Sequence, residues 1–289
     1  MSERIALVTG AGRRNSIAHA IARALADDGW DVAVTTWTSY ERRVPLGGDP
    51  ELDPDDLRRE LIARGARAIR IEADLADPTT PERVLAEVVD RLGTPSSLVL
   101  SHSESVDSGL LDTTLESFDR HFAVNTRAAW LLIRAFAERF GEASAEPEAT
   151  PGPAPVRASD SGSVSASASA SASADDRDPR AGHGSIIALT SDHVVGNVPY
   201  GASKGALDRI VIAAAREVGP LGITANLVDP GPVDTGWMDA STRERLTALQ
   251  PTGRLGTPAD AARLVAWLAS DDGRWVSGQR IRSDGASAV

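Results

Sequence analysis

The chain has 289 residues, of which 42% are hydrophobic and 25% charged, and this length and composition are typical of one α/β domain with a substantial core. The sequence contains no cysteine, which excludes disulfides, thiolate catalysis and cysteine-based zinc sites, and its five histidines are too scattered for a metal-ligand cluster. A formal net charge of -11 argues against a nucleic-acid-binding surface and favours a small-molecule partner.

The apolar runs of this sequence are too short for a signal peptide or a membrane span. The chain opens with MSERIALVTG, in which charged residues precede a brief apolar run, and no later stretch is long enough either. We therefore expect a cytoplasmic protein without a membrane partner.

Short apolar runs of β-strand type alternate with segments of helical period. In chain order, we expect strands at residues 5–9, 31–36, 66–72, 97–101, 185–190, 224–228 and 279–283. Helical spacing is found at residues 17–25, 79–92, 115–140, 200–218 and 258–270. This alternation predicts a Rossmann-type α/β fold, in which a doubly wound parallel sheet of about seven strands carries helices on both faces.

Residues 141–183 interrupt the alternation. This stretch is rich in Ser, Ala, Pro and Asp and has little apolar surface to bury, which predicts a disordered low-complexity insertion within a single domain spanning residues 1–289. Because the insertion precedes the strand at 185–190, we expect it at the amino edge of the sheet. Ligands of such sheets bind beyond the carboxyl edge.

A glycine-containing turn, TGAGRRNSIA at residues 9–18, joins the first strand to the first helix. Small residues let the backbone approach a pyrophosphate, and a helix N-terminus offers unpaired N–H groups. Gly10, Gly12, Ser16 and Ile17 are therefore candidate dinucleotide contacts. A tight βα connection without a ligand would show the same pattern.

The residues around the second strand bear on the choice of cofactor. An acidic residue at its end favours the ribose 2′-hydroxyl of NAD, whereas arginine favours the 2′-phosphate of NADP. The strand ends in Thr35-Thr36-Trp37 without an acid, and Arg13 and Arg14 lie in the glycine turn. We expect NADP(H) rather than NAD(H), with Trp37 beside it. The alternative is that both arginines are solvated surface charges.

Six segments, which cover nearly the whole chain apart from the insertion, resemble the short-chain dehydrogenase/reductase family. They are Thr9-Gly10, Asp74-Leu75, Asn125, Ser191, Tyr200-Gly201-Ala202-Ser203-Lys204 and Asp229-Pro230-Gly231-Pro232. Within the family, the sequence is similar to bacterial 3-oxoacyl-carrier-protein reductases. The resemblance implies an NADP(H)-dependent oxidoreductase that transfers hydride between nicotinamide and a carbonyl or alcohol substrate.

Tyr200 and Lys204 lie four residues apart at the start of an expected helix, so both project from one face. An ammonium beside a phenol, together with a nicotinamide cation, stabilises the phenolate and lowers its pKa from the usual value near 10. By resemblance, Tyr200 donates the proton, Lys204 also holds the ribose hydroxyls, Ser191 polarises the substrate carbonyl, and Asn125 holds a water in a proton relay.

The resemblance also implies cofactor contacts after three of the strands. These are Asp74, Leu75, Ser101, Pro230, Gly231, Val233 and Thr235. Asp74 would bond the adenine amino group, or serve only as a strand-end cap, and the last four residues would hold the nicotinamide carboxamide and the pyrophosphate. Trp237 and Met238 follow, as a substrate lid or as a cap on the core.

The sequence departs from the family pattern in three places. Ser101-His102-Ser103-Glu104 stands where the family has Asn-Asn-Ala-Gly, Ser16 and Ala18 replace two turn glycines, and the loop that follows Ser191 is short. Asp192 or His193 of that loop are further candidates for polarising the carbonyl or contacting the substrate. These departures leave open a reductase or tailoring enzyme for a specialised metabolite, including imine reduction, and a non-catalytic nucleotide-binding protein.

The family forms dimers and tetramers through two long helices. The corresponding apolar stripes here are residues 128–136 and 210–215. We therefore expect a homodimer or homotetramer.

Overall fold

The computed structural model describes residues 4–44, 46–144 and 183–287. Seven strands form one sheet in the order β3-β2-β1-β4-β5-β6-β7, with every neighbouring pair parallel. They are β1 (Ile5–Val8), β2 (Asp31–Thr36), β3 (Ala68–Glu72), β4 (Ser97–Leu100), β5 (Gly184–Leu189), β6 (Ile223–Asp229) and β7 (Arg280–Arg282). The predicted fold class is confirmed, and each strand ends within two residues of its predicted bounds.

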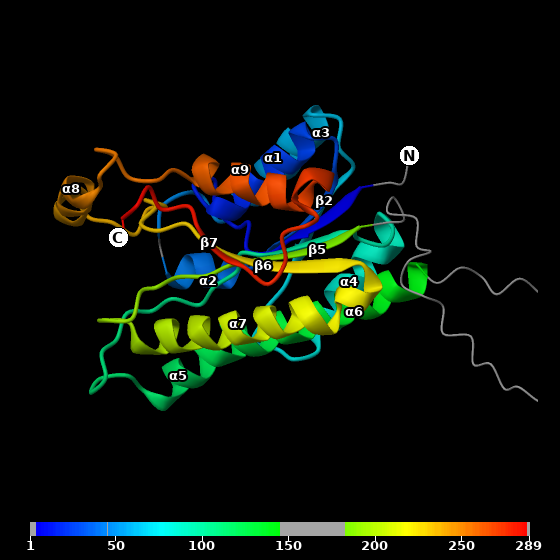
Figure 1. The fold of residues 1–289 in the computed structure, drawn as a ribbon. Coiled ribbons are helices and arrows are strands. Elements are labelled where there is room, and N and C mark those ends of the chain that lie inside the picture. The colour runs from blue at the N-terminus through cyan, green and yellow to red at the C-terminus, as the bar shows by residue number, and fades with distance from the viewer. Residues whose placement is uncertain (1–3, 45, 145–182, 288–289) are drawn as a thin grey trace, which may run out of the picture.

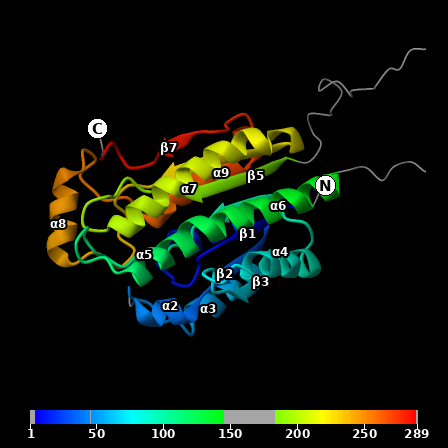
Figure 2. The same cartoon turned by 90° about the horizontal axis from the view of Figure 1, so that it is seen from below.

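Helices cover both faces of this sheet (Figures 1 and 2). One face carries α1 (Ile17–Asp27), α3 (Asp53–Ala63) and α9 (Pro258–Ala269). The other carries α4 (Thr80–Arg91), α5 (Leu115–His121), the π-helix η1 (Phe122–Ala128), α6 (Ala129–Ser144) and α7 (Val198–Glu217). At the carboxyl edge, the short α2 (Thr38–Arg43) follows β2, and α8 (Ala240–Leu249) lies beyond the strand ends (Figure 1).

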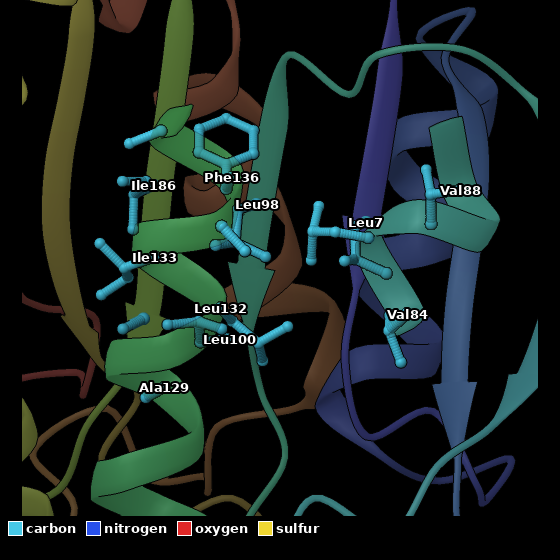
Figure 3. Packing of buried hydrophobic residues seen from close by; sticks show 14 of the residues in the cluster. Leu7, Val84, Val88, Leu98, Leu100, Ala129, Leu132, Ile133, Phe136 and Ile186 are labelled. Atoms are coloured by element: carbon cyan, nitrogen blue, oxygen red, sulfur yellow. The ribbon is translucent and has the colours of Figure 1, made fainter. Parts of the chain in front are cut away.

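The largest core lies between the sheet and the α4/α6 layer. Leu132 and Phe136 of α6 pack against Leu98 of β4, and Val88 of α4 faces Leu7 of β1 (Figure 3). All four residues of β1 and of β4 are buried, because helices cover both faces. This packing fixes the carboxyl ends of the central strands.

The two predicted oligomer stripes, residues 128–136 and 210–215, are divided between the core and the surface. Ala128, Leu132 and Phe136 are fully buried, as is Val211 in the second stripe, so these residues face the sheet. Trp130 and Ile212, which belong to the same stripes, are exposed on the outer face, as is Phe118 of α5.

The expected insertion begins later than predicted. Helix α6 continues to Ser144, so residues 141–144 form its last turn, and Phe140 just before them is buried. Residues 145–182 lie outside the described residues. Helix α6 ends, and β5 begins at Gly184, on the side of the sheet opposite its carboxyl edge. Within the described part of the chain, no helix is both long and apolar enough to cross a membrane.

Candidate active site

The predicted site residues converge because β1, β3, β4, β5 and β6 all end at the same edge of a parallel sheet. Each strand is followed by one of the segments identified from the sequence. The short loop after β5 then leads into α7, which carries Tyr200 and Lys204. Pro199 in the first turn of α7 favours a helix start at this point.

Tyr200 lies at the centre of this group. The ammonium nitrogen of Lys204 is 5.8 Å from the centre of its ring. Burial raises the pKa of Tyr200 to about 12, against the smaller opposing effect of the Ser191 and Ser103 hydroxyls. Burial therefore acts against the lowered pKa expected from the sequence, because it removes water that would stabilise the phenolate.

Lys204 is directed at the end of the neighbouring strand. Its Nζ donates a hydrogen bond to the carbonyl oxygen of Leu189, at 2.9 Å, and the side chain is buried. Burial lowers the pKa of Lys204 to about 8, against the opposing effect of the Asp208 carboxylate. The ammonium thus has a fixed position beside Tyr200 and loses its proton more readily than an exposed lysine.

Asn125 lies on the π-helix η1, and its side chain is fully hydrogen-bonded. Its Oδ1 accepts from the backbone N–H of Glu104 at 2.7 Å, while its Nδ2 donates to the carbonyl oxygen of Glu104 and to Ser203 Oγ, both at 2.9 Å. Ser203 Oγ in turn donates to the carbonyl oxygen of Tyr200 at 2.8 Å. The amide therefore positions two catalytic segments, and any relay water at this residue would have to contact its main chain.

The segment after β4 replaces the family motif with residues that make new contacts. Ser101 donates its N–H to Thr9 Oγ1 at 3.0 Å. The His102 ring contacts Thr9 Oγ1 at 2.7 Å and the carbonyl oxygen of Val124 at 3.1 Å. Burial lowers the pKa of His102 to about 3, so the imidazole is neutral and links the end of β1 to η1. The close approach also explains Gly10, where a Cβ would lie 2.6 Å from His102 Cα.

Glu104 connects this segment to α2 and α5. Its buried carboxylate accepts two hydrogen bonds from Arg43, at 2.8 and 2.7 Å, and one from Arg120 Nε at 3.1 Å. The Arg43 guanidinium lies 5.3 Å from the Tyr40 ring and that of Arg120 lies 4.6 Å from the Trp37 ring. The sequence flagged Glu104 only as a departure from the family, and its partners are too distant in sequence to be predicted.

The two arginines of the glycine turn point in different directions. Arg14 is half exposed and pairs with Asp56 and Glu60 of α3, at 2.9 and 3.4 Å. Arg13 is largely buried and lies beside Glu41 of α2, with 3.1 Å between Nε and Oε2. Only Arg13 therefore remains close to the cleft side of the turn.

The glycine turn fits a phosphate-bearing dinucleotide. Gly10 has a φ of +81°, and Ser16 caps α1 by accepting the N–H of His19 at 3.1 Å, so that Ile17 is the first helical residue. Nε and Nη1 of Arg13 are buried without a hydrogen-bond partner. Unused guanidinium donors beside a helix N-terminus suit an anionic ligand.

The residues expected to hold the two ends of the cofactor lie after β3 and β6. The Asp74 carboxylate accepts the N–H of Ala76 at 2.9 Å and lies 3.5 Å from Arg120 Nη2, and Leu75 is buried. After β6, Gly231 has a φ of +61° and donates its N–H to the Asp229 carboxylate at 3.2 Å. These positions border the edge where a dinucleotide binds in such sheets.

The rest of the post-β6 segment is divided between the core and the surface. Pro230 and Val233 are buried, and Thr235 is partly exposed. Met238 is buried and thus caps the core, whereas Trp237 is half exposed and its Nε1 donates to the carbonyl oxygen of Val233 at 2.9 Å. Of the two lid candidates, only Trp237 presents a large surface to an incoming molecule.

The loop after Ser191 does not bring its other polar residues to the phenol. Asp192 is 3.7 Å from Arg282 of β7, and His193 is exposed. Ser103, which the sequence named only as part of the altered segment after β4, donates a hydrogen bond to Asn125 Oδ1 at 3.3 Å. Within the residues that the structure describes, no group of three or more His, Cys, Asp or Glu side chains could hold a metal ion.

Comparisons with known proteins agree with this arrangement. The family model described as enoyl-(acyl carrier protein) reductase matches residues 10–146 and 160–286. The uncharacterized oxidoreductase YjdA of Bacillus subtilis is 33% identical, with 98% of this chain and 96% of that protein covered. Versicolorin reductase 1 of Aspergillus parasiticus is 32% identical, over 98% of this chain and 96% of the relative.

Solved structures show the same fold. A blue fluorescent protein from a metagenomic library, in complex with NADPH, has a TM-score of 0.75 and 29% identity, covering 99% of this chain and 98% of its own. A short-chain dehydrogenase from Burkholderia cenocepacia, in complex with NADP, has a TM-score of 0.74 and 28% identity, with the same coverage. The chain therefore belongs to the short-chain dehydrogenase/reductase family and is an NAD(P)-dependent oxidoreductase.

Proposed function

We propose that this protein reduces a carbonyl group to an alcohol with NADPH. The proposal depends chiefly on one observation, the Lys204 ammonium 5.8 Å from the ring centre of a partly buried Tyr200 at the carboxyl edge of the sheet. A phenol with a pKa of about 12 is fully protonated at neutral pH and can donate its proton. The bound nicotinamide supplies the hydride to the carbonyl carbon.

The residues of the chain supply the proton and stabilise the negative charge that its transfer leaves on Tyr200. Ser191 donates a hydrogen bond to the carbonyl oxygen and polarises it, and Tyr200 then delivers its proton to that oxygen. The resulting phenolate is stabilised by Lys204, which is an ammonium below its pKa of about 8. Asn125 keeps the Glu104 and Ser203 segments in place through its hydrogen bonds.

The preference for NADP(H) rests on charge. Strand β2 ends in Thr36 and Trp37, and no acidic residue follows directly at the strand end. Arg13 has unused guanidinium donors close to the glycine turn. The NADPH and NADP complexes of the similar structures support the same choice.

Two substrate classes fit the loops that border Tyr200. The loops after β4 and β5 pair through Ser108 and Asn197, and they expose aliphatic side chains such as Leu111 and Val195, which are 98% and 84% exposed. An apolar rim suits either a 3-oxoacyl chain or an aromatic ketone of a specialised metabolite. The similarity to versicolorin reductase supports the aromatic ketone of a specialised metabolite as the alternative to the 3-oxoacyl chain.

The decisive experiment is NADPH consumption with a panel of 3-oxoacyl thioesters, aromatic ketones and cyclic imines. We expect Tyr200→Phe to lower turnover by about a thousandfold, because the general acid is lost. The only other tyrosine of the chain, Tyr40, provides a matched control, and Tyr40→Phe should change turnover by less than about tenfold. Nicotinamide binding without turnover of any panel member would instead favour the non-catalytic alternative.

We also propose a cytoplasmic homo-oligomer that associates through the outer face of α5, η1, α6 and α7. Phe118, Trp130 and Ile212 are between 37% and 47% exposed on these helices. A hollow of about 490 Å³ adjoins Trp130 and is also lined by Phe122 and Ile210. A measurement of mass in solution gives the number of copies.

A further inference from the structure

Helix α2 places one carboxylate directly on the glycine turn. A Cβ added to Gly12 would lie 2.5 Å from Glu41 Oε1, so Glu41 covers the backbone at this position. The other oxygen, Oε2, is 3.1 Å from Arg13 Nε. Because α2 follows β2 immediately, this carboxylate comes from the part of the fold where the adenosine ribose of a dinucleotide is expected.

The Glu41–Arg13 pair is buried but poorly hydrogen-bonded. The side chains are 10% and 14% exposed, respectively. Glu41 Oε2, Arg13 Nε and Arg13 Nη1 nevertheless lack a hydrogen-bond partner. Burial raises the pKa of Glu41, and the Arg13 charge opposes this shift. The two groups thus attract each other by charge while the donors of the guanidinium remain available to a better-aligned acceptor.

Other ion pairs of this region differ from the Glu41–Arg13 pair. Arg42 and Glu51 also pair between α2 and the following segment, but their side chains are 63% and 57% exposed. Water and salt screen such a pair strongly. Glu51 therefore carries the same charge as Glu41 in the same part of the chain without facing the turn.

We propose that Glu41 is a specificity-determining residue that limits the preference for a 2′-phosphate over a 2′-hydroxyl on the adenosine ribose, against the opposing effect of Arg13. This inference rests on the proposed dinucleotide site. A 2′-phosphate carries close to two negative charges and needs the Arg13 guanidinium, so the Glu41 carboxylate repels it and competes for its anchor. A 2′-hydroxyl can instead donate a hydrogen bond to the carboxylate. Neutralising Glu41 shifts selectivity toward NADP(H).

The experiment compares two probes that differ only in the 2′-phosphate, adenosine 5′-monophosphate and adenosine 2′,5′-bisphosphate. Their affinities are measured by calorimetry on the full chain, and those of NADH and NADPH by fluorescence. In Glu41→Gln, which keeps the shape of the side chain, we expect the affinity ratio of bisphosphate to monophosphate to rise about tenfold. The NADPH to NADH ratio should rise in the same direction.

Two variants serve as controls. Glu51→Gln removes the same charge from an exposed pair and should change the ratio by less than about twofold. Glu41→Asp keeps the charge, so its ratio should stay closer to that of the wild type than to that of Glu41→Gln. In Arg13→Gln, the preference for the bisphosphate should fall, because the shared cation is lost.

The outcomes separate this inference from the proposed function. A ratio in Glu41→Gln that stays at the wild-type value, or changes no more than in Glu51→Gln, overturns the role of Glu41. Should Glu41→Gln fail to fold, an unchanged ratio in Arg13→Gln overturns it instead. If the wild type binds neither the probes nor the two cofactors, the dinucleotide site itself is wrong.

Discussion

The catalytic end and the adenosine end of the cleft are built differently. Around Tyr200, the polar side chains have fixed partners: the Asn125 amide bonds Glu104 and Ser203, and Lys204 bonds the Leu189 carbonyl oxygen. Around the glycine turn, Arg13 keeps buried donors without partners. The difference is that Asn125 and Lys204 have their hydrogen-bond partners within the protein, whereas Arg13 has its charge paired by Glu41 but keeps donors that an acceptor of a ligand could use.

The largest effect should come from the ammonium at the catalytic end. Lys204→Met removes the charge that stabilises the phenolate, and we expect kcat/KM to fall by about 10²–10³-fold. Because burial lowers the pKa of Lys204 to about 8, reduction by the wild type should also decline as pH rises through about 8. A pH–rate profile measures this.

Lys204→Arg sharpens the same test. Arginine stays charged throughout the alkaline range, so any activity that this variant retains should lack the decline near pH 8. A wild-type profile that is flat from about pH 7 to 9 would show that Lys204 does not titrate as its burial implies.

The second effect concerns stability in acid. The pKa of His102 is about 3 in the folded protein, against 6.5 for an unperturbed histidine, so between these pH values the unfolded chain binds a proton that the native imidazole does not bind. Stability should therefore be fully present above about pH 6.5 and fall as pH drops toward 3, by up to about 1.4 kcal/mol per pH unit for this group.

Urea unfolding at several pH values, with His102→Gln as the comparison, measures this contribution. Glutamine cannot titrate but can still bond the Val124 carbonyl oxygen, so the variant should lose stability less steeply in acid than the wild type. Burial also lowers the pKa of His19 and His183, and these groups remain in both proteins. Equal slopes would mean that His102 is protonated in the native state.

The smallest effect concerns the ion pairs of Glu104, which connect the segment after β4 to α2 and α5. Glu104→Gln leaves Arg43 and Arg120 without their shared carboxylate, and we expect the free energy of unfolding to fall by about 1–2 kcal/mol, less than for a fully buried pair because both arginines reach solvent. Glu138→Gln is the control, since its helical partner Arg134 is exposed, and should cost about 0.5 kcal/mol or less. Equal losses of unfolding free energy in the two variants would show that the Glu104 pairs do not connect the segment after β4 to α2 and α5 more strongly than an exposed helical pair would.

The strands and main helices were predictable because their signals are local. Each buried strand is a short apolar run, and α1, α4 and α9 have a clear apolar face. Helices α2, α3 and α8 were missed because they are short or polar: α8 buries no residue, and α3 begins with three acidic residues that favour its N-terminus without forming an apolar stripe.

In the candidate site too, contacts between residues close in sequence were predictable and contacts between distant residues were not. Tyr200 and Lys204 share one helix turn, so sequence spacing places them together. Glu41 meets Arg13 only because β2 returns beside β1, and Glu104 meets Arg43 and Arg120 only in the folded chain. Contacts between distant residues of opposite charge cannot be assigned from sequence, because many charged partners are available.

Asn125 has a further consequence for the architecture of the sheet. Its amide accepts the N–H of Glu104 and donates to the carbonyl oxygen of the same residue, which is how an adjacent strand would bond it. One side chain thereby satisfies both main-chain groups of Glu104, which lies four residues past the end of β4. Aspartate has no donor and leucine has neither group, so only an amide can satisfy both in this way.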